Sequence, residues 1–515
     1  MAEQGSGPAA EIAQGYVSEG AAVELGAVVI DGRTEAAAAV RLPLATLNRH
    51  GLVAGATGAG KTKTLQLISE QLSAAGVPVV LADVKGDLSG LSAAGEANDK
   101  LTKRAQELGD DWAPAASPVQ FLSLGTGGKG SPIRATITSF GPVLLSKVLG
   151  LNETQESTLG LIFHWADQRG LALLDTKDLR SVITHLTSDE GKADLKGIGG
   201  VSAATAGVIL RALSNLEAQG GEDFFGEPEL DVHDLMLQAD GKGVVTLLEL
   251  DDLQSKPALF STFLMWLLAE LFEELPEEGD LDKPKLVFFF DEAHLLFDDA
   301  SKAFLERIEQ TVKLIRSKGV GVFFCTQLPT DIPNAVLSQL GARVQHALRA
   351  FTPDDQKALA RTVKTYPKTP YYDLETALTS LGIGEAVVTV LSERGAPTPV
   401  AWTRLRAPRS KMGSVGDGAV AAAVASSDLH AKYSETIDRE SAYEKLAARV
   451  AAPADAPPVA ETPAPAPAPA GKAEKEDPGL ISQAMSNPAV KSFMRSAASA
   501  LGREITRGLF GNRRR

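Results

Sequence analysis

The chain has 515 residues, of which 44% are apolar and 23% are charged, and at about 150 residues per domain this length corresponds to about three domains. The profile is typical of a globular protein with a sizeable core and excludes a collagen-like, wholly disordered or disulfide-stapled chain. Asp and Glu outnumber Lys and Arg by 65 to 51, which gives a net charge of −14. An evenly acidic surface repels nucleic acid, so contact with nucleic acid would need a local basic patch. Cys325 is the single cysteine, which excludes an internal disulfide and a cysteine-based zinc site and fits a reducing cytoplasm.

Two features of the sequence argue against a membrane protein. The N-terminus has no basic region followed by an apolar stretch, so it does not read as a secretory signal. The most apolar stretch, residues 258–275, contains three glutamates and has its apolar residues at helical spacing. A membrane span needs ~20 nearly charge-free residues. We therefore expect a soluble, cytoplasmic protein.

The first 45 residues form a short N-terminal segment of apolar pieces separated by Gly and Asp, and we expect a hairpin or two edge strands there. From residue 46 the pattern changes to strand, Gly-rich turn, helix and strand. The strands and the helix of this pattern are residues 51–54, 63–75 and 77–82. Continuous apolar strands that alternate with amphipathic helices predict an α/β fold with a mostly parallel sheet covered on both faces. Residues 46–139 are the first part of this predicted core.

Residues 140–240 carry amphipathic runs without an obvious buried strand, and we interpret them as a helical insertion in the core. The core resumes over residues 241–410, where five more apolar strands are predicted. They are residues 243–248, 286–290, 320–325, 342–348 and 386–391. A turn at residues 394–399 separates the last of them from residues 400–405, which predicts an edge hairpin that closes the sheet.

The C-terminal part differs in composition from the core. Residues 411–477 are predicted to form a helical and Pro/Ala-rich linker, because nine Ala and seven Pro fill sixteen of the twenty positions of residues 451–470. Residues 478–515 are predicted to form an amphipathic helix, with seven basic residues and one acidic residue from Gly479 onward. Such a helix can pack on the body or on a neighbouring subunit, tether DNA or RNA, or lie on a membrane surface, and the sequence leaves all three open.

The strongest functional signal is a glycine-rich loop between a strand and a helix. Its sequence matches G-x-x-x-x-G-K-[ST], the phosphate-binding loop of nucleotide-binding proteins. Backbone N–H groups curl around phosphates in such a loop, so glycine is needed where a Cβ would clash or where φ is positive. Lys61 is predicted to reach the β- and γ-phosphates, and the Thr62 hydroxyl is predicted to bind Mg²⁺. The residues predicted to bind ATP are Gly55, Ala56, Thr57, Gly58, Ala59, Gly60, Lys61, Thr62 and Thr64.

A second signal is an Asp–Glu pair after the predicted strand 286–290. Asp291 emerges at the carboxyl end of this strand, where ligands bind in open α/β sheets, and is predicted to hold Mg²⁺ directly or through water. Glu292 is placed to orient and deprotonate an attacking water, which favours a hydrolase over a kinase. The alternative is that both carboxylates cap a helix from Ala293. His294 either couples the site to a partner or is a structural residue.

Further polar residues stand at the ends of predicted strands and helices. Gln327 follows the strand 320–325 and either senses the γ-phosphate or satisfies loop backbone with its amide. Arg316 ends a helical stretch and is either a helix C-terminal cation or an arginine finger that reaches the ATP of a neighbouring subunit. Weaker candidates for the finger are Arg49, Arg343 and Arg349. Asp83 and Asp87 either support the metal or cap the following helix.

Five stretches together resemble the HerA-like branch of the HerA/FtsK P-loop ATPases. They are residues 49–62, 83–87, 290–294, 316–321 and 326–329. The details are most similar to a bacterial helicase-HerA-like subfamily, in which stretches like residues 149–155 and 220–228 also occur within the insertion. The resemblance covers about residues 20–410 and the basic end near residues 507–511.

This resemblance implies a RecA-like ATPase core, commonly assembled as a hexameric ring that moves double-stranded DNA, with ATP at the subunit interfaces. By position, it implies hydrolysis of ATP with Mg²⁺ by Lys61, Thr62, Asp291 and Glu292, γ-phosphate sensing by Gln327, and a finger in trans from Arg316. Members of the DNA-end-resection type carry an N-terminal β-barrel, for which about 45 residues are too few. The resemblance therefore does not extend to a resection role or a partner nuclease.

Two functions follow from the sequence. One is an oligomeric ATPase motor that acts on double-stranded DNA, and the other is an ATP-driven switch or remodeller that acts on protein partners. Glu292 argues against a non-enzymatic scaffold, which needs no general base. Residues 281–285 lack an L-S-G-G-Q-like signature before the Asp–Glu strand, which argues against an ABC-type ATPase.

Overall fold

The computed structural model describes residues 7–195, 199–218, 220–250, 257–279, 281–297 and 302–451. Residues 452–477 of the predicted linker and the whole predicted basic helix lie outside these residues. Within the described residues, no helix combines the length and the apolar character needed to cross a bilayer.

Twelve strands of the described chain form one sheet in the order β2-β1-β14-β13-β12-β3-β11-β10-β4-β9-β5-β6. The strands are β1 (Ala22–Ile30), β2 (Arg33–Pro43), β3 (Gly51–Ala54), β4 (Val79–Asp83), β5 (Val119–Leu124), β6 (Ser131–Ile133), β9 (Val245–Glu249), β10 (Leu286–Phe290), β11 (Val320–Thr326), β12 (Ala342–Gln345), β13 (Glu385–Thr389) and β14 (Ala401–Leu405). From β12 to β6 all neighbours are parallel, and from β12 to β2 they are antiparallel. A separate small hairpin joins β7 (Gln238–Ala239) and β8 (Lys242–Gly243).

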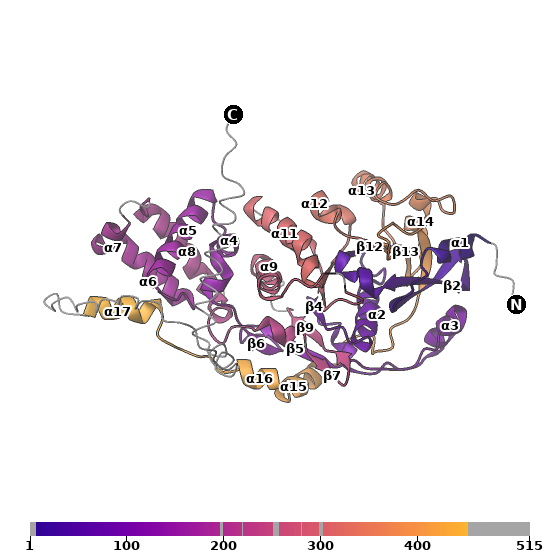
Figure 1. The fold of residues 1–515 in the computed structure, drawn as a ribbon, viewed down its shortest axis with the longest axis horizontal. Coiled ribbons are helices and arrows are strands. Elements are labelled where there is room, and N and C mark those ends of the chain that lie inside the picture. Colours follow the sequence, from indigo (N-terminus) through magenta and orange to yellow (C-terminus); the bar gives the residue numbers. More distant parts are fainter. Residues whose placement is uncertain are drawn as a thin grey trace, which may run out of the picture. The chain divides into compact units, whose positions relative to one another are not determined.

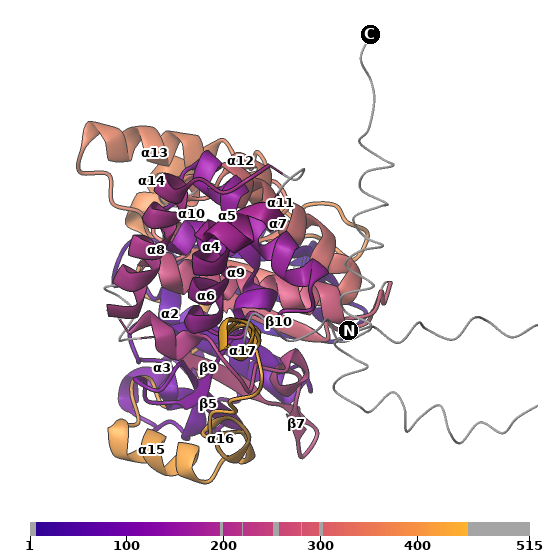
Figure 2. The same ribbon diagram turned by 90° about the vertical axis from the view of Figure 1, so that its left-hand side faces the viewer.

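The helices lie around this sheet as Figures 1 and 2 show. They are α1 (Pro8–Gln14), α2 (Lys61–Ala74), α3 (Asp99–Leu108), α4 (Ile137–Val148), α5 (Glu153–Gln168), α6 (Thr176–Thr187), α7 (Asp189–Asp194), α8 (Ala203–Ala218), α9 (Pro257–Glu274), α10 (His294–Phe297), α11 (Lys302–Leu314), α12 (Asn334–Leu337), α13 (Pro353–Val363), α14 (Leu374–Ser380), α15 (Asp417–Ala425), α16 (Asp428–Tyr433) and α17 (Ala442–Ala451).

The central strands are buried on both faces, as their continuous apolar sequences predict. In β10, Phe288 and Phe290 belong to the core that α4, α9 and α11 cover, whereas Val287 and Phe289 belong to the core beside α2. Alternate side chains of a strand point to opposite faces, so this split requires a cover on each face. The predicted α/β fold with a mostly parallel, doubly covered sheet is confirmed.

The prediction that the β13–β14 hairpin closes the sheet is wrong. β14 pairs with β1, β1 pairs with β2, and β2 is the outer strand. β1 is buried along most of its length, so its backbone N–H and C=O groups need partners on both sides, which β14 and β2 supply. Gly26 permits the pairing, because a Cβ at this position would lie 1.9 Å from the Arg404 carbonyl oxygen.

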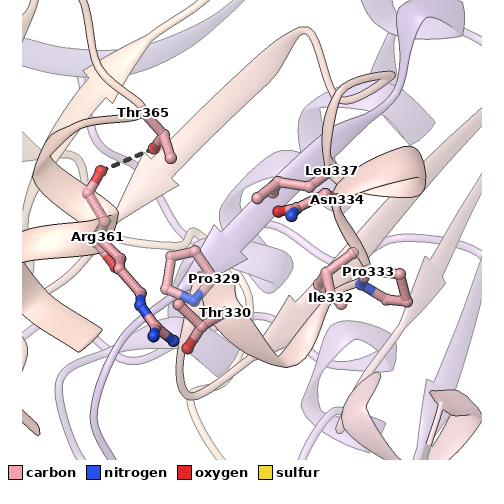
Figure 3. Close-up of a pocket in the computed structure, with 9 residues that line it drawn as sticks. Pro329, Thr330, Ile332, Pro333, Asn334, Leu337, Arg361 and Thr365 are labelled. Atoms are coloured by element: carbon pink, nitrogen blue, oxygen red, sulfur yellow. Dashed lines mark hydrogen bonds between the residues drawn. The ribbon is translucent and has the colours of Figure 1, made fainter. Parts of the chain in front are cut away.

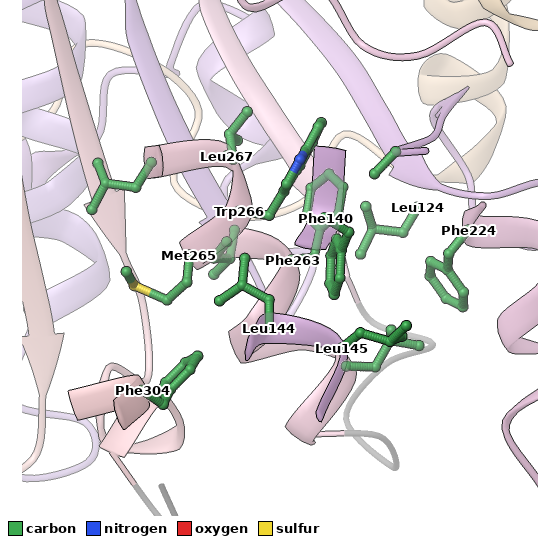
Figure 4. Close-up of a cluster of buried hydrophobic side chains, with 14 of the residues drawn as sticks. Leu124, Phe140, Leu144, Leu145, Phe224, Phe263, Met265, Trp266, Leu267 and Phe304 are labelled. Atoms are coloured by element: carbon green, nitrogen blue, oxygen red, sulfur yellow. The ribbon is translucent and has the colours of Figure 1, made fainter. Parts of the chain in front are cut away.

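The helices α4 to α8 occupy the stretch between β6 and β9, where the described chain adds no strand to the large sheet before β9. Figure 4 shows how α9 joins this region to the sheet: Phe263 and Trp266 of α9 lie among Phe140, Leu144 and Leu145 of α4. At the other end of the described chain, α17 packs against α6, and the Tyr443 amide donates to the Asp178 carboxylate (2.8 Å). The α4–α8 region is therefore packed against both the sheet and the C-terminal helices.

Candidate nucleotide-binding and catalytic site

The loop between β3 and α2 is held between the ends of two neighbouring strands. The Gly55 amide donates to the Thr326 carbonyl at the end of β11 (3.2 Å), and the Ala56 amide donates to the Ala347 carbonyl just after β12 (2.8 Å). β3 lies between β11 and β12 in the sheet. The loop therefore stands at the carboxyl-end edge of the parallel strands, where open α/β sheets bind ligands.

Three glycines give this loop its curled backbone. Gly58 and Gly60 have φ values of 79° and 114°, in the left-handed region that favours glycine. A Cβ on Gly55 would lie 2.5 Å from the Cβ of His346, so only glycine fits there. The glycine positions of the sequence motif thus correspond to backbone geometry that other residues would strain.

The N-terminus of α2 faces this loop without a side-chain cap. Gly60 occupies the N-cap position and has no side chain that could accept a hydrogen bond from the first turn. Lys61 is buried, and its Nζ donates to the Gly55 carbonyl (2.7 Å) and to the Ala56 carbonyl (3.4 Å). Uncapped amides at the positive end of a helix, with a lysine across the loop, form a site suited to phosphate groups.

A buried histidine, His346, packs against the phosphate loop from the protein interior. Burial lowers the pKa of His346 to about 4, and the nearby Lys61 cation acts in the same direction. The neutral ring therefore donates from Nδ1 to the Glu385 carbonyl (3.0 Å), and its Nε2 accepts the Thr64 hydroxyl (2.8 Å). Thr64, which the sequence predicts as an ATP ligand, thus directs its hydroxyl into the protein toward His346.

The Asp–Glu pair lies at the end of β10, two strands from β3. Burial raises the pKa of Asp291, the Glu292 carboxylate adds to this rise, and a hydrogen bond with the Cys325 thiol opposes it. The Asp291 carboxylate accepts the Glu292 amide (2.9 Å), and Glu292 has a φ of 48°. A non-glycine residue in this left-handed region is uncommon and marks a position that the surrounding structure enforces.

The motif at residues 83–87 contributes a residue that the sequence did not single out. The Nζ of Lys85 lies 2.8 Å from the Glu292 Oε1. Asp83 is buried at the end of β4, and its carboxylate accepts the amides of Lys85 (3.2 Å), Gly86 (2.8 Å) and Leu88 (2.9 Å). Asp83 therefore orders the loop after β4, and the ion pair of Lys85 with Glu292 links this loop to the Asp–Glu pair.

Comparison with known proteins gives the chain its family. The family model described as "Helicase HerA-like C-terminal" matches residues 29–515. The chain belongs to the HerA-like family. No curated protein matches it.

Solved structures agree with this assignment at the level of the fold. The plasmid coupling protein TrwB in complex with a non-hydrolysable ATP analogue is 17% identical, with a TM-score of 0.51, and the match covers 77% of this chain and 99% of that chain. Unbound TrwB, a bacterial conjugative coupling protein, is 15% identical with a TM-score of 0.50, covering 79% and 93%. The HerA-like chain is a P-loop ATPase with a RecA-like core.

The structure brings some of the other predicted residues of this HerA-like ATPase to the phosphate-loop edge. Gln327 directly follows β11 and is exposed beside the strand end that accepts the Gly55 amide. Arg349 is exposed after β12, and its guanidinium donates to the Thr57 carbonyl (3.3 Å). Both side chains therefore border the loop within one subunit.

Arg316 lies at the opposite edge of the sheet, where the parallel strands begin. It stands in the turn Ile315–Lys318 before β11, and the seven residues of that strand separate this turn from the phosphate loop by about 20 Å. Arg49, directly before His50 and β3, also lies at this edge. Neither arginine can reach the phosphate loop of its own subunit.

A cavity of about 400 Å³ opens beside the segment that follows Gln327. Figure 3 shows the Arg361 side chain next to Pro329 and Thr330, with Leu337 and Asn334 of α12 across the cavity. The cavity lies next to the phosphate-loop edge and does not include residues of the loop itself.

His346 and Lys85 are the site residues that the sequence analysis missed. His346 stands one residue after β12, and Lys85 stands within a motif from which only the carboxylates were considered. His346 lies against Gly55, 291 positions away in the sequence, and Lys85 pairs with Glu292, 207 positions away. Contacts of such long range leave no local signal in the sequence.

Proposed function

We propose that this HerA-like ATPase hydrolyses Mg²⁺-ATP as an oligomeric ring motor that acts on double-stranded DNA. The observation that supports the hydrolase part is the common edge of β3, β11 and β10, from which the phosphate loop and Glu292 both extend. The ATP γ-phosphate would lie between Lys61 and the Glu292 carboxylate, with Gln327 beside it.

The residues of the site fit a magnesium ion. Mg²⁺ prefers a few hard oxygen ligands and keeps several waters, so one carboxylate and one hydroxyl with the phosphates are sufficient. Asp291 supplies a buried carboxylate, and Thr62 supplies a hydroxyl at the start of α2. The ion would neutralise phosphate charge during the reaction.

Hydrolysis would proceed by in-line attack of water on the γ-phosphorus. Glu292 accepts the proton of this water, the bond to the β–γ bridging oxygen breaks, and ADP leaves with the electron pair. Lys61 binds the β- and γ-phosphates throughout, and the helix α2 amides bind the remaining oxygens.

The position of Arg316 supports the proposed ring. An arginine finger stabilises charge in the transition state, and this arginine lies at the sheet edge away from its own phosphate loop. If Arg316 acts as the finger, it acts on ATP bound by a neighbouring subunit, and Arg49, at the same edge of the sheet, would face the same interface.

The alternative target is a protein partner. The net charge of −14 favours it, because an acidic surface approaches DNA only through a local basic patch. In that case the ATPase would work as a switch or remodeller without nucleic acid.

The deciding experiment measures the ATPase rate of the purified full chain at low salt, with and without double-stranded DNA, together with its mass in solution. Several-fold stimulation by DNA and a ring-sized mass would support the DNA motor. Steady hydrolysis that DNA does not change would favour the protein-directed ATPase. Glu292→Gln is the control for contaminating ATPases, because it is expected to remove the intrinsic activity in both cases.

A further inference from the structure

The contact between Lys85 and Glu292 is asymmetric. Lys85 Nζ binds the Oε1 oxygen at 2.8 Å. The Oε2 oxygen is buried and has no hydrogen-bond partner among the residues that the structure describes, and the closest charged group to it in an ion-pair contact is His294 Nδ1 at 3.6 Å. One carboxylate oxygen is therefore held, and the other remains able to accept a proton.

Lys85 approaches Glu292 from a fixed backbone. The strands β4 and β10 are parallel neighbours, so the loops that follow them start side by side. Asp83 accepts three backbone amides of the loop after β4, including that of Lys85. The Glu292 side chain is 13% exposed and the Lys85 side chain is 47% exposed, so the lysine reaches an enclosed carboxylate from the solvent side.

We propose that Lys85 is a positioning residue for the general base: it holds Glu292 Oε1 so that Oε2 faces the attacking water. This inference rests on the proposed function of Glu292. A glutamate has several rotatable side-chain bonds, and a free carboxylate samples orientations in which neither oxygen meets the water. General-base catalysis requires the acceptor within hydrogen-bond distance of the proton it removes, so fixing one oxygen raises the productive fraction.

The positive charge of Lys85 also reduces the repulsion between two neighbouring carboxylates. Asp291 and Glu292 are adjacent carboxylates, and two like charges repel each other strongly where water is scarce. The Lys85 cation faces both of them. Without it, Glu292 would gain from turning away from Asp291, which moves the base from the site.

The test compares three variants of the full chain in steady-state hydrolysis and in ATP binding. Lys85→Met keeps the aliphatic stem and removes the cation. We expect kcat to fall about tenfold to a hundredfold, a part of the ~10²–10⁴ that a general base contributes, while the Kd for ATP changes less than twofold. Lys85→Arg should restore most of the rate. Lys357→Met is the matched control, because Lys357 forms an exposed ion pair with Asp354 (2.9 Å) on α13.

A double variant separates positioning from other roles. Because Lys85 acts through Glu292, adding Lys85→Met to Glu292→Gln should cause no further loss of the residual rate. A further loss there, an unchanged kcat in Lys85→Met, or a parallel weakening of ATP binding would overturn the inference. Far-UV circular dichroism and Tm check that each variant is folded. Absence of hydrolysis in the wild-type chain would overturn both this inference and the proposed function, whereas hydrolysis that does not depend on Lys85 would overturn this inference alone.

Discussion

The two edges of the parallel sheet each contain a buried histidine next to the ends of β3. At the phosphate-loop edge, His346 is tied to Thr64 and the Glu385 carbonyl. At the opposite edge, His50 contacts the Val312 carbonyl (2.7 Å) and accepts the Val322 amide (3.1 Å). Burial lowers the pKa of each to about 4, and a cation near each ring, Lys61 or Arg316, acts in the same direction.

The surroundings of these two neutral histidines differ. The edge with His346 also has an uncapped helix N-terminus, Lys61 and, at the end of β10, the Asp–Glu pair, to which the proposed function assigns phosphate binding and water activation. Beside His50 lie arginines and no phosphate-binding loop of the described chain. Under the proposed function, a buried neutral histidine therefore supports the phosphate-binding side of the site at one edge and, at the other edge, the side that serves a neighbour's site.

The largest expected effect comes from breaking the chemistry at the phosphate-loop edge. Glu292→Gln removes the proton acceptor and keeps the shape of the side chain. We expect kcat to fall by about 10²–10⁴, with ATP binding retained. Single-turnover hydrolysis and ATP titration measure the two quantities, and near-normal turnover would contradict the role of Glu292 as the base.

The next effect comes from the opposite edge. Arg316→Ala should lower the rate by about a hundredfold if the guanidinium stabilises transition-state charge. Mixing Arg316→Ala chains with Lys61→Ala chains should restore part of the activity, because some interfaces then combine an intact phosphate loop with an intact finger. Assemblies shown by mass to be mixed, yet without any restored activity, would count against action in trans.

The same comparison separates what the sequence predicts from what it does not. The glycine spacing of residues 55–62 and the Asp–Glu pair after an apolar strand are local patterns, and the structure puts both at one edge of the sheet. The prediction that the β13–β14 hairpin closes the sheet was wrong, because the pairing of β14 with β1 joins residues almost 380 positions apart. His346 and Lys85 were missed for the same reason: their importance comes from contacts across the sheet, which residue types alone do not encode.

A smaller effect tests whether the two histidines differ in function as well as in position. His346→Ala leaves the Thr64 hydroxyl and the Glu385 carbonyl without their partner, and His50→Ala does the same to Val312 and Val322. Each substitution should lower the free energy of unfolding by about 1–3 kcal/mol. His346→Ala should also weaken ATP binding about fivefold to tenfold, and His50→Ala should leave it unchanged. Equal weakening in both variants, measured by ATP titration, would remove the distinction between the two edges.

The smallest effect is a pH dependence of stability that both histidines share. Each pKa is about 4 in the folded protein and 6.5 in the unfolded chain, so protons bind the unfolded chain first as the pH falls. As the pH falls from 6.5 to about 4, each histidine therefore lowers the free energy of unfolding by about 1 kcal/mol per pH unit. Burial raises the pKa of Asp83 to about 6, above its ordinary value of 3.8. Below pH 6, protons therefore bind Asp83 in the folded protein first, which stabilises the fold on acidification and offsets about one of the two histidines.

Urea unfolding of the wild type and of His50→Gln at pH 7 and pH 5 isolates one histidine, because Asp83 and His346 are common to both chains. The wild type should lose stability more steeply on acidification, by about 1 kcal/mol per pH unit relative to the variant. Parallel pH profiles would mean that His50 is charged or exposed in the folded protein. Because Arg316 lies near His50, adding Arg316→Ala should reduce the difference slightly, and an effect of this kind would connect the buried histidine to the arginine that the proposed ring requires.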